Sequence, residues 1–193
     1  SSYAMSDFNN IRPDVCWDAA NGDYQVIWLQ EWSTRNINNF GYDDWDVLQR
    51  SVKSSDGSMG SVVGVATSPQ HEGDPCIVYD PVNKATIAAW NFRSSLTSPL
   101  NGIIANNSVA ADSNDTQDLR LAVDPDGGRL LATWTKSPPS SAKFVEGATF
   151  SLSSPGSRVG SVVTIGSGSE DHFAARPACN ASLKEALVSW TRK

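Results

Sequence analysis

Aromatic and acidic side chains gather in one long polar segment of this sequence. The segment follows an apolar run and contains Trp32, Tyr42, Asp43, Asp44 and Trp45. An aromatic ring stacks on the apolar C–H face of a sugar, while carboxylate groups accept hydrogen bonds from its hydroxyls. Residues of these types, so close together, predict a carbohydrate-binding site.

Four further residues are candidates because they lie in segments of the same kind. Phe92 and Arg93 lie shortly after the apolar run that ends at Trp90, and His71 and His172 each precede another run. The competing interpretation is that the aromatic side chains only hold long loops against the core. On the binding hypothesis, we expect all of these residues to contact the ligand.

The same acidic segment offers oxygen ligands of the kind that calcium prefers, at Asp43, Asp44 and Asp46. The spacing matches no EF-hand loop, so no cofactor is predicted and Ca²⁺ stays an alternative. Catalysis has less support, because the sequence contains no G-x-S-x-G, H-E-x-x-H or phosphate-binding glycine motif. Carboxylates for glycoside hydrolysis are available, but no pair stands out among so many acids. We therefore predict no catalytic residue and favour a non-catalytic protein.

Four segments with a common pattern must position these candidates. Each consists of a short apolar run, a turn and a second apolar run that closes on tryptophan. They span Arg12–Trp28, Asp74–Trp90, Leu119–Trp134 and Arg176–Trp190. Hairpins repeated at about fifty residues are typical of a β-propeller or a related array. We expect each closing tryptophan to fill the space between neighbouring blades.

Two of the repeats contain the same series of four expected strands. In the first repeat they are Pro13–Asp18, Tyr24–Leu29, Trp45–Val52 and Val62–Ala66. In the third they are Leu119–Val123, Leu130–Trp134, Phe144–Leu152 and Val162–Ile165. The segments before the last strand agree almost by letter, as SSDGSMGSVV and SSPGSRVGSVV, which indicates internal duplication. The second repeat has weaker strand signals after Trp90, and its outer strands are expected at Ile103–Ala105 and Ser108–Ala110.

The predicted fold is therefore all-β: one β-propeller domain over residues 1–193, with about four blades of four antiparallel strands. The repeats cover approximately residues 13–66, 75–110, 119–165 and 175–193. The last blade is either incomplete or completed by residues 1–12. Two other hypotheses are kept: two chains share one larger ring, or the chain is part of a longer protein. The alternative fold is a β-sandwich.

The chain resembles β-propeller repeat proteins whose units read Pro-x-apolar-x-Asp, a turn, and apolar-x-Trp. In general form it is similar to sugar-binding, lectin-like propellers. Signatures of better-defined families are missing, since neither Trp17-Asp18 nor Trp45-Asp46 closes a repeat. The segment Ser54–Gly57 also lacks the Thr-Trp end of a sialidase Asp-box. The resemblance implies the architecture more than the ligand.

Strand order places the long loops at one end of the predicted blades. In a four-stranded antiparallel unit, the loop between the second and third strands lies at the same end as the connector between units. This end collects Gln30–Asp44, Asn91–Gly102 and Thr135–Lys143. Function usually lies on long loops that a rigid frame carries. We therefore expect a carbohydrate-binding module that uses this face; the alternatives are a protein-interaction scaffold and, less favoured, a glycoside-active enzyme.

Composition limits the partners of the chain. With a net charge of −6 and scattered Lys and Arg, it has no basic stripe, so nucleic acid is not expected. No apolar run is long enough to span a bilayer. The expected partner is a glycan or a glycoprotein, and a homo-oligomer stays open.

The compartment is less constrained than the partners. An extracellular location is favoured, and three sequons, at Asn106, Asn114 and Asn180, would permit glycosylation there. The sequence has three cysteines, so one of them has no intramolecular partner. Cys16 and Cys179 are candidates for a disulfide that closes the ring of blades.

Overall fold

The computed structural model describes residues 10–31, 45–68, 71–93, 101–104, 107–108, 115–180, 182 and 185–193. Their regular structure consists of β-strands without a helix, which confirms the predicted all-β class. No helix in this part of the chain is long and apolar enough to cross a membrane. Four of the candidate residues, Trp32, Tyr42, Asp43 and Asp44, lie outside the described residues.

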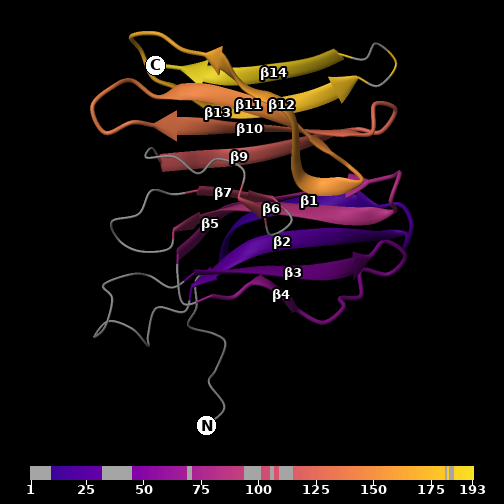
Figure 1. The fold of residues 1–193 in the computed structure, drawn as a ribbon. Helices are drawn as coiled ribbons and strands as arrows, with labels where there is room; N and C mark the ends of the chain where they lie inside the picture. The colour runs from indigo at the N-terminus through magenta and orange to yellow at the C-terminus, as the bar shows by residue number, and fades with distance from the viewer. Residues whose placement is uncertain are drawn as a thin grey trace.

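The strands form three four-stranded units and a hairpin, which we call units 1 to 4 (Figure 1). Unit 1 contains β1 (Asn10–Asp18), β2 (Asp23–Glu31), β3 (Trp45–Lys53) and β4 (Val63–Ala66). Unit 2 contains β5 (His71–Asp80), β6 (Ala85–Arg93), β7 (Asn101–Ile104) and β8 (Asn107–Ser108). Unit 3 contains β9 (Asp115–Asp124), β10 (Arg129–Ser137), β11 (Phe144–Ser151) and β12 (Ser154–Gly166). Unit 4 is the hairpin of β13 (His172–Asn180) and β14 (Glu185–Arg192).

Within every unit, consecutive strands pair antiparallel, and the units lie one upon another in chain order (Figure 1). A single parallel pairing, between Trp45 and His71, joins units 1 and 2 into one eight-stranded sheet. Units 3 and 4 form separate sheets, and none of these sheets closes on itself. Stacked open sheets of this kind also fit the β-sandwich alternative.

The strands expected for the first and third repeats occur near their predicted places, with one clear difference. The strand β12 begins at Ser154, so most of the segment that resembles the turn of the first repeat is strand instead. In unit 2 the outer strands β7 and β8 lie slightly before the predicted positions. Pairing with β11 explains the longer β12, because Ser151 pairs with Ser154 almost directly across the turn.

The first strand of every unit contains a β-bulge at the same place. Two of its residues lie opposite a single residue of the second strand, and the first of the two is a non-glycine residue with positive φ. These residues are Arg12 (φ 53°), Asp74 (φ 45°), Asp118 (φ 51°) and Ala174 (φ 56°). Such a conformation is uncommon outside glycine, so its recurrence indicates that the four first strands are structurally equivalent.

This equivalence corrects the predicted start of the fourth repeat. The sequence pattern aligned Arg176 with Arg12, because both residues precede a proline. In the structure, Ala174 takes the place of Arg12. The Arg-Pro pair therefore forms the bulge in unit 1 but follows the bulge in unit 4.

The closing tryptophan of each repeat is the residue that lies opposite the bulge. Trp28, Trp90, Trp134 and Trp190 all hold this position in the second strand of their units. Trp134 is fully buried and Trp90 is 5% exposed, whereas Trp190 is 41% exposed. The tryptophans of units 2 and 3, which lie inside the stack, are thus the most deeply buried of the four (Figure 1).

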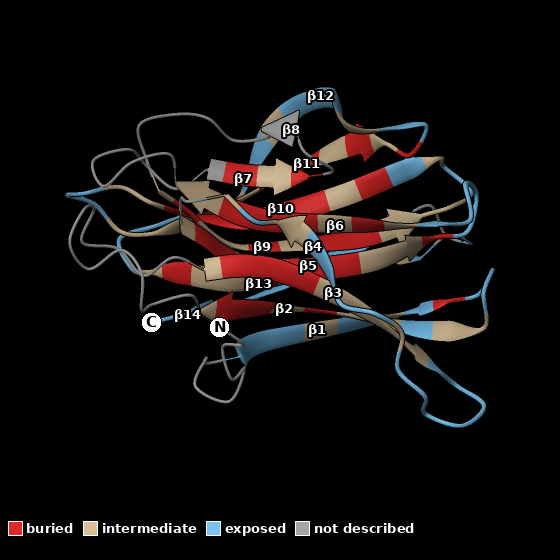
Figure 2. Cartoon of the chain, turned by 90° about the horizontal axis from the view of Figure 1, so that it is seen from below, coloured by how far each residue is buried: buried red, intermediate tan, exposed pale blue. Residues whose placement is uncertain are grey.

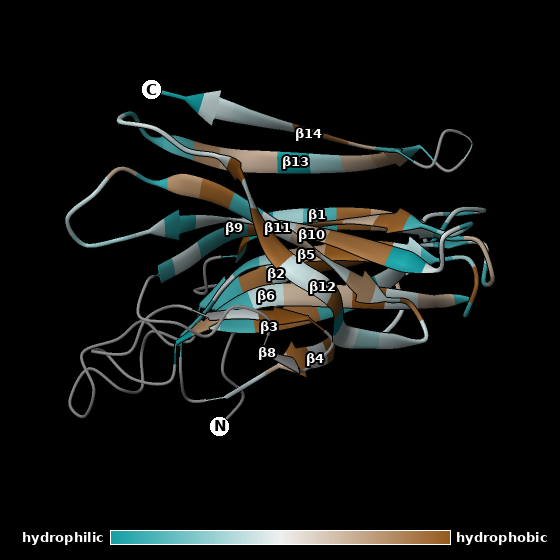
Figure 3. Cartoon of the chain, turned by 45° about the horizontal axis from the view of Figure 1, so that its top comes forward, coloured by the Kyte–Doolittle hydropathy of each residue, from teal (hydrophilic) through white to brown (hydrophobic). Residues whose placement is uncertain are grey.

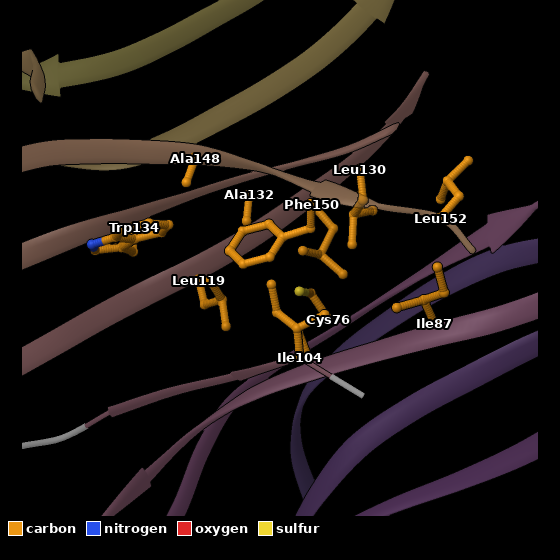
Figure 4. Packing of buried hydrophobic residues seen from close by; sticks show 12 residues of the cluster. Cys76, Ile87, Ile104, Leu119, Leu130, Ala132, Trp134, Ala148, Phe150 and Leu152 are labelled. Atoms are coloured by element: carbon orange, nitrogen blue, oxygen red, sulfur yellow. The ribbon is translucent and has the colours of Figure 1, made fainter. Parts of the chain in front are cut away.

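Two apolar clusters hold the stack together, each between neighbouring units. The larger joins units 2 and 3 (Figure 4) and contains Cys76, Ile87, Ala89, Ile104, Leu119, Leu121, Leu130, Ala132, Trp134, Ala148, Phe150 and Leu152. The smaller joins units 1 and 2 and contains Ile27, Leu29, Val47, Ile77 and Trp90. In both, the tryptophan of the later unit packs against the earlier unit. Figure 2 shows the same distribution, with the buried positions on inner strands and an exposed β1.

The first hairpins of units 1, 2 and 3 turn at an aspartate that organises the backbone. Asp80 is buried, and its Oδ1 accepts hydrogen bonds from the N–H groups of Val82 (2.8 Å) and Asn83 (3.3 Å). Asp18 and Asp124 hold the equivalent positions and accept the equivalent turn bonds. Such Asx turns favour a tight reversal. The turn of unit 2 also ties it to unit 3, because Asn83 Nδ2 donates to the carbonyl oxygen of Leu152 at 2.9 Å.

All three cysteines are free thiols, so the disulfide considered between Cys16 and Cys179 is not present. Cys76 lies within the larger apolar cluster, 2% exposed. Burial raises the pKa of its thiol from 9.0 to about 12, because the thiolate would lose its hydration there.

Truncating Trp134 is expected to destabilise the protein far more than truncating Trp190. Trp134→Ala removes a fully buried indole and the bond from its Nε1 to Glu146 Oε2 (2.9 Å). It should lower the free energy of unfolding by about 3–5 kcal/mol. Trp190→Ala removes a ring that is 41% exposed, so we expect about half of that loss or less. Urea unfolding measures both values, and equal losses would contradict this difference in packing.

Cys76 should make the fold sensitive to alkaline pH. Its pKa is raised in the folded state, so its stabilising contribution is complete below about pH 9 and is lost as the pH rises toward about 12. Cys76→Ala removes this dependence, while the titration of Tyr and Lys side chains is common to both proteins. Urea unfolding across this range should therefore show a steeper loss of stability in the wild type. Parallel curves would refute the assignment.

Candidate functional site

A cavity of about 400 Å³ opens where the first strands of units 1 to 3 begin. The three bulges bring Arg12, Asp74 and Asp118 to its wall. The second strands add Leu29 and Asn91 at the positions that follow the closing tryptophan. The chain supplies these polar residues because the bulge turns a part of an otherwise apolar strand toward the cavity.

Asp74 is the centre of the polar network in this cavity. Its Oδ1 forms an ion pair with Arg12 of unit 1. Its Oδ2 accepts hydrogen bonds from Asn91 Nδ2 (3.0 Å) and from the backbone N–H of Asp118 (3.4 Å). One carboxylate thus links three units. The Arg12 side chain is 57% exposed, so solvent weakens the ion pair, and the bonds to buried groups matter more.

Asn91 has a buried acceptor that the described residues leave without a hydrogen bond. The side chain is 1% exposed and donates to Asp74, but its Oδ1 accepts no bond from the described part of the chain. An unsatisfied buried acceptor costs about 1–3 kcal/mol. Since Asn91 lines the cavity, a hydroxyl or amide of a bound molecule could donate to this atom.

Two predicted residues, Trp45 and His71, do lie at the cavity. They pair with each other where β3 meets β5, and both line the wall. Trp45 also packs against the smaller apolar cluster, which holds the ring in place. The structure therefore brings one aromatic ring of the predicted loop next to carboxylates, although these carboxylates are Asp74 and Asp118.

Phe92 and Arg93 lie at the same end of unit 2 but do not line the cavity. Phe92 packs against the smaller apolar cluster. Arg93 Nη2 lies 3.3 Å and 3.2 Å from the carboxylate oxygens of Asp115, and so connects units 2 and 3. The contact of Phe92 agrees with the competing interpretation, in which the aromatic side chains only hold long loops against the core.

His172 holds a structural position in unit 4, apart from the cavity wall. Its Nδ1 accepts a hydrogen bond from Trp190 Nε1 at 2.9 Å, and its side chain is buried. Asn10 does the same in unit 1, where its Oδ1 accepts a bond from Trp28 Nε1 at 3.0 Å. The two acceptors hold equivalent places in the first strands. Gly166 allows the close approach of the indole, since a Cβ there would lie 2.9 Å from Trp190.

Sequence reasoning missed the bulge residues, because it assigned function to long loops and structure to the apolar runs. The missed residues are the bulge residues Arg12, Asp74 and Asp118, together with Asn91 and Gln117 from the neighbouring positions of the wall. A signal was present, since a charged residue precedes the apolar run in units 1 to 3. Its recurrence at the same place in three repeats could have identified a shared polar site.

The described residues contain no group of three or more His, Cys, Asp or Glu side chains that could hold a metal ion. Asp43 and Asp44, on which the Ca²⁺ alternative depends, lie outside those residues. Asp46 is buried in β3, opposite Gln30.

No protein-family model, curated protein or solved structure matches this chain. The function must therefore be argued from the geometry of the cavity.

Asp74 should contribute more to stability than its equivalent in unit 3. Asp74→Ala leaves the buried Nδ2 of Asn91 without its acceptor and removes the ion-pair partner of Arg12. We therefore expect a loss of about 2–3 kcal/mol in the free energy of unfolding. Asp74→Asn keeps an acceptor and tolerates positive φ, so its loss should be smaller. Asp118→Ala is the matched control, since among the described residues its carboxylate accepts only a long bond from Thr135 Oγ1 (3.4 Å). Urea unfolding ranks the three variants, and a larger loss for Asp118→Ala would reject this network.

Proposed function

We propose that this chain is a non-catalytic carbohydrate-binding module whose sugar occupies the cavity between units 1, 2 and 3. The observation that carries the proposal is the buried side chain of Asn91, a residue that lines this cavity and whose Oδ1 accepts no hydrogen bond from the described residues. A sugar hydroxyl is a suitable donor for it. Nearby, the carboxylates of Asp74 and Asp118 are further acceptors.

An aromatic surface beside these acceptors supports a sugar over a simple polar ligand. Trp45 and His71 line the same wall, and a ring of this kind stacks on the C–H face of a pyranose. Arg12 and Gln117 add hydrogen-bond donors at the wall. The cavity can therefore both donate hydrogen bonds to sugar hydroxyls and accept hydrogen bonds from them. The cavity of about 400 Å³ lies within the range of small-molecule sites.

We extend the proposal to the architecture: the units are blades of a propeller-like array arranged about one axis. A second cavity, of about 410 Å³, supports it, because the first strands of all four units contribute to its lining through Pro13, Pro75, Arg120 and Arg176. First strands that share one central space are expected of blades about an axis. A two-layer sandwich gives no reason for such convergence.

A glycan or glycoprotein outside the cell is the partner that fits this proposal. Weak sites gain avidity when several copies engage one glycan-bearing surface. Nothing in the proposed contacts requires a metal ion, because the acceptors and the stacking surface come from the protein itself.

Glycan-array screening followed by titration calorimetry tests the proposal. We expect at least one glycan to bind, and Asn91→Leu to weaken that binding roughly tenfold or more through loss of the acceptor. Gln117→Leu provides a second test at a less buried position of the wall. Asn21→Ala is the matched control, because it alters an exposed turn amide that does not line the cavity.

Two results would overturn the proposal. The first is an array on which no glycan binds the folded wild type. The second is a bound glycan whose affinity is unchanged in both Asn91→Leu and Gln117→Leu, since the sugar would then lie elsewhere.

A further inference from the structure

Every unit inside the stack uses two different faces to meet its neighbours. The side that carries the closing tryptophan, which we call the tryptophan face, packs against the preceding unit. The opposite side of the second strand, which we call the receiving face, packs against the following unit. At the junction of units 1 and 2, for example, Trp90 packs against Ile27 and Leu29.

The junction between units 2 and 3 follows the same rule. Trp134 and Leu130 of unit 3 lie on its tryptophan face, and they share a cluster with Ile87 and Ala89 on the receiving face of unit 2. The third junction has the same polarity, because the indole of Trp190 lies against Gly166 at the end of unit 3. All three junctions therefore join a tryptophan face to a receiving face.

No described unit packs on the tryptophan face of unit 1, and this face carries large apolar side chains. It includes Val15, Trp17 and Tyr24, which are 55%, 43% and 46% exposed. In units 2 and 3, the positions equivalent to Val15 are Ile77 and Leu121, which are 3% and 8% exposed. The same position is therefore buried wherever a preceding unit is present.

Trp17 and Tyr24 already form an ordered aromatic pair on this face. Their ring centroids lie 5.1 Å apart at an interplanar angle of 63°. Fixed aromatic side chains make good anchors, because little conformational entropy remains to be lost on binding. Large apolar side chains exposed together on one face mark a surface through which a protein associates with another protein.

At the other end of the stack, no described unit packs on the receiving face of unit 4 (Figure 3). Leu187 is 73% exposed there, whereas the equivalent Ile87 of unit 2 is 4% exposed. Ala178, which pairs with Leu187, is exposed on the same side. The chain thus presents one free face of each kind, and within the chain these two kinds always pack together.

We propose that two copies of this chain associate head to tail, with the tryptophan face of unit 1 in one copy docked on the receiving face of unit 4 in the other. The contact repeats the junction that the chain forms three times internally. Because the two surfaces differ, the interface is heterologous, and a closed pair covers both end faces of both copies. The inference is independent of the ligand in the cavity, since neither face lines it.

Light scattering coupled to gel filtration, over a series of protein concentrations, tests the proposal. The wild type should approach twice the single-chain mass of 20.7 kDa as concentration rises. Trp17→Asp and Leu187→Asp should each raise the dissociation constant roughly tenfold or more, because each places a carboxylate in an apolar contact. Val82→Asp is the matched control, since Val82 is an exposed valine (56%) in the β5–β6 turn and belongs to neither face.

Mixing the two variants separates this geometry from other dimers. The Trp17→Asp copy keeps its receiving face and the Leu187→Asp copy keeps its tryptophan face, so the mixture should form a pair that neither variant forms alone. Val15→Asp replaces Trp17→Asp should the latter fail to fold, as judged by circular dichroism. A wild type of single-chain mass at every concentration would overturn the proposal. So would an association lost in Trp17→Asp but intact in Leu187→Asp, because that pattern belongs to a symmetric contact between two tryptophan faces.

Discussion

The stack depends on one local arrangement: a tryptophan in the second strand opposite a two-residue bulge in the first. The bulge adds one residue to the first strand, increases its local twist and makes room on one side of the hairpin. The indole at that position then reaches the preceding unit, as Trp90 and Trp134 do in the two apolar clusters. In units 1, 3 and 4 its ring nitrogen donates to an acceptor of the same unit, Asn10, Glu146 or His172. In unit 3 this bond pairs an N–H that is fully buried.

The same bulge creates the polar site on the other side of the hairpin. Residues with positive φ point away from the regular pleat, and three of the four are charged: Arg12, Asp74 and Asp118. In unit 4 the position is Ala174, which adds no charge. The polar network therefore belongs to units 1 to 3, where the carboxylate of Asp74 connects all of them. One backbone feature thus sets both the spacing of the units and the chemistry of the cavity.

Much of the fold could be predicted from the sequence, because alternating apolar runs, turns and closing tryptophans are local signals. The bulge could not be predicted, because a single extra residue in a strand does not change the composition of the segment. The fourth repeat was therefore aligned by its Arg-Pro pair and not by its bulge. The candidate cavity includes two of the residues predicted for the site. Trp45 and His71 lie on the cavity wall, but the acceptors around them come from strands whose apolar neighbours suggested a purely structural role. Long-range convergence of three strands is a tertiary property that one strand's sequence does not contain.

The stability of such a stack is close to a sum over units and their junctions, so its ends differ from its middle. Unit 4 illustrates the point, because an isolated two-stranded hairpin is at best marginally stable in water. It is held by the connector that precedes it: the Asp171 carboxylate accepts the N–H of Lys143 at 2.9 Å, and the Asp171 backbone pairs with that of Lys193. The backbone N–H of His172 also donates to Lys143, which closes unit 4 onto unit 3. Leu187 on its receiving face is 73% exposed and Trp190 is only partly covered, so a neighbour on that face would bury apolar surface that unit 4 leaves in solvent.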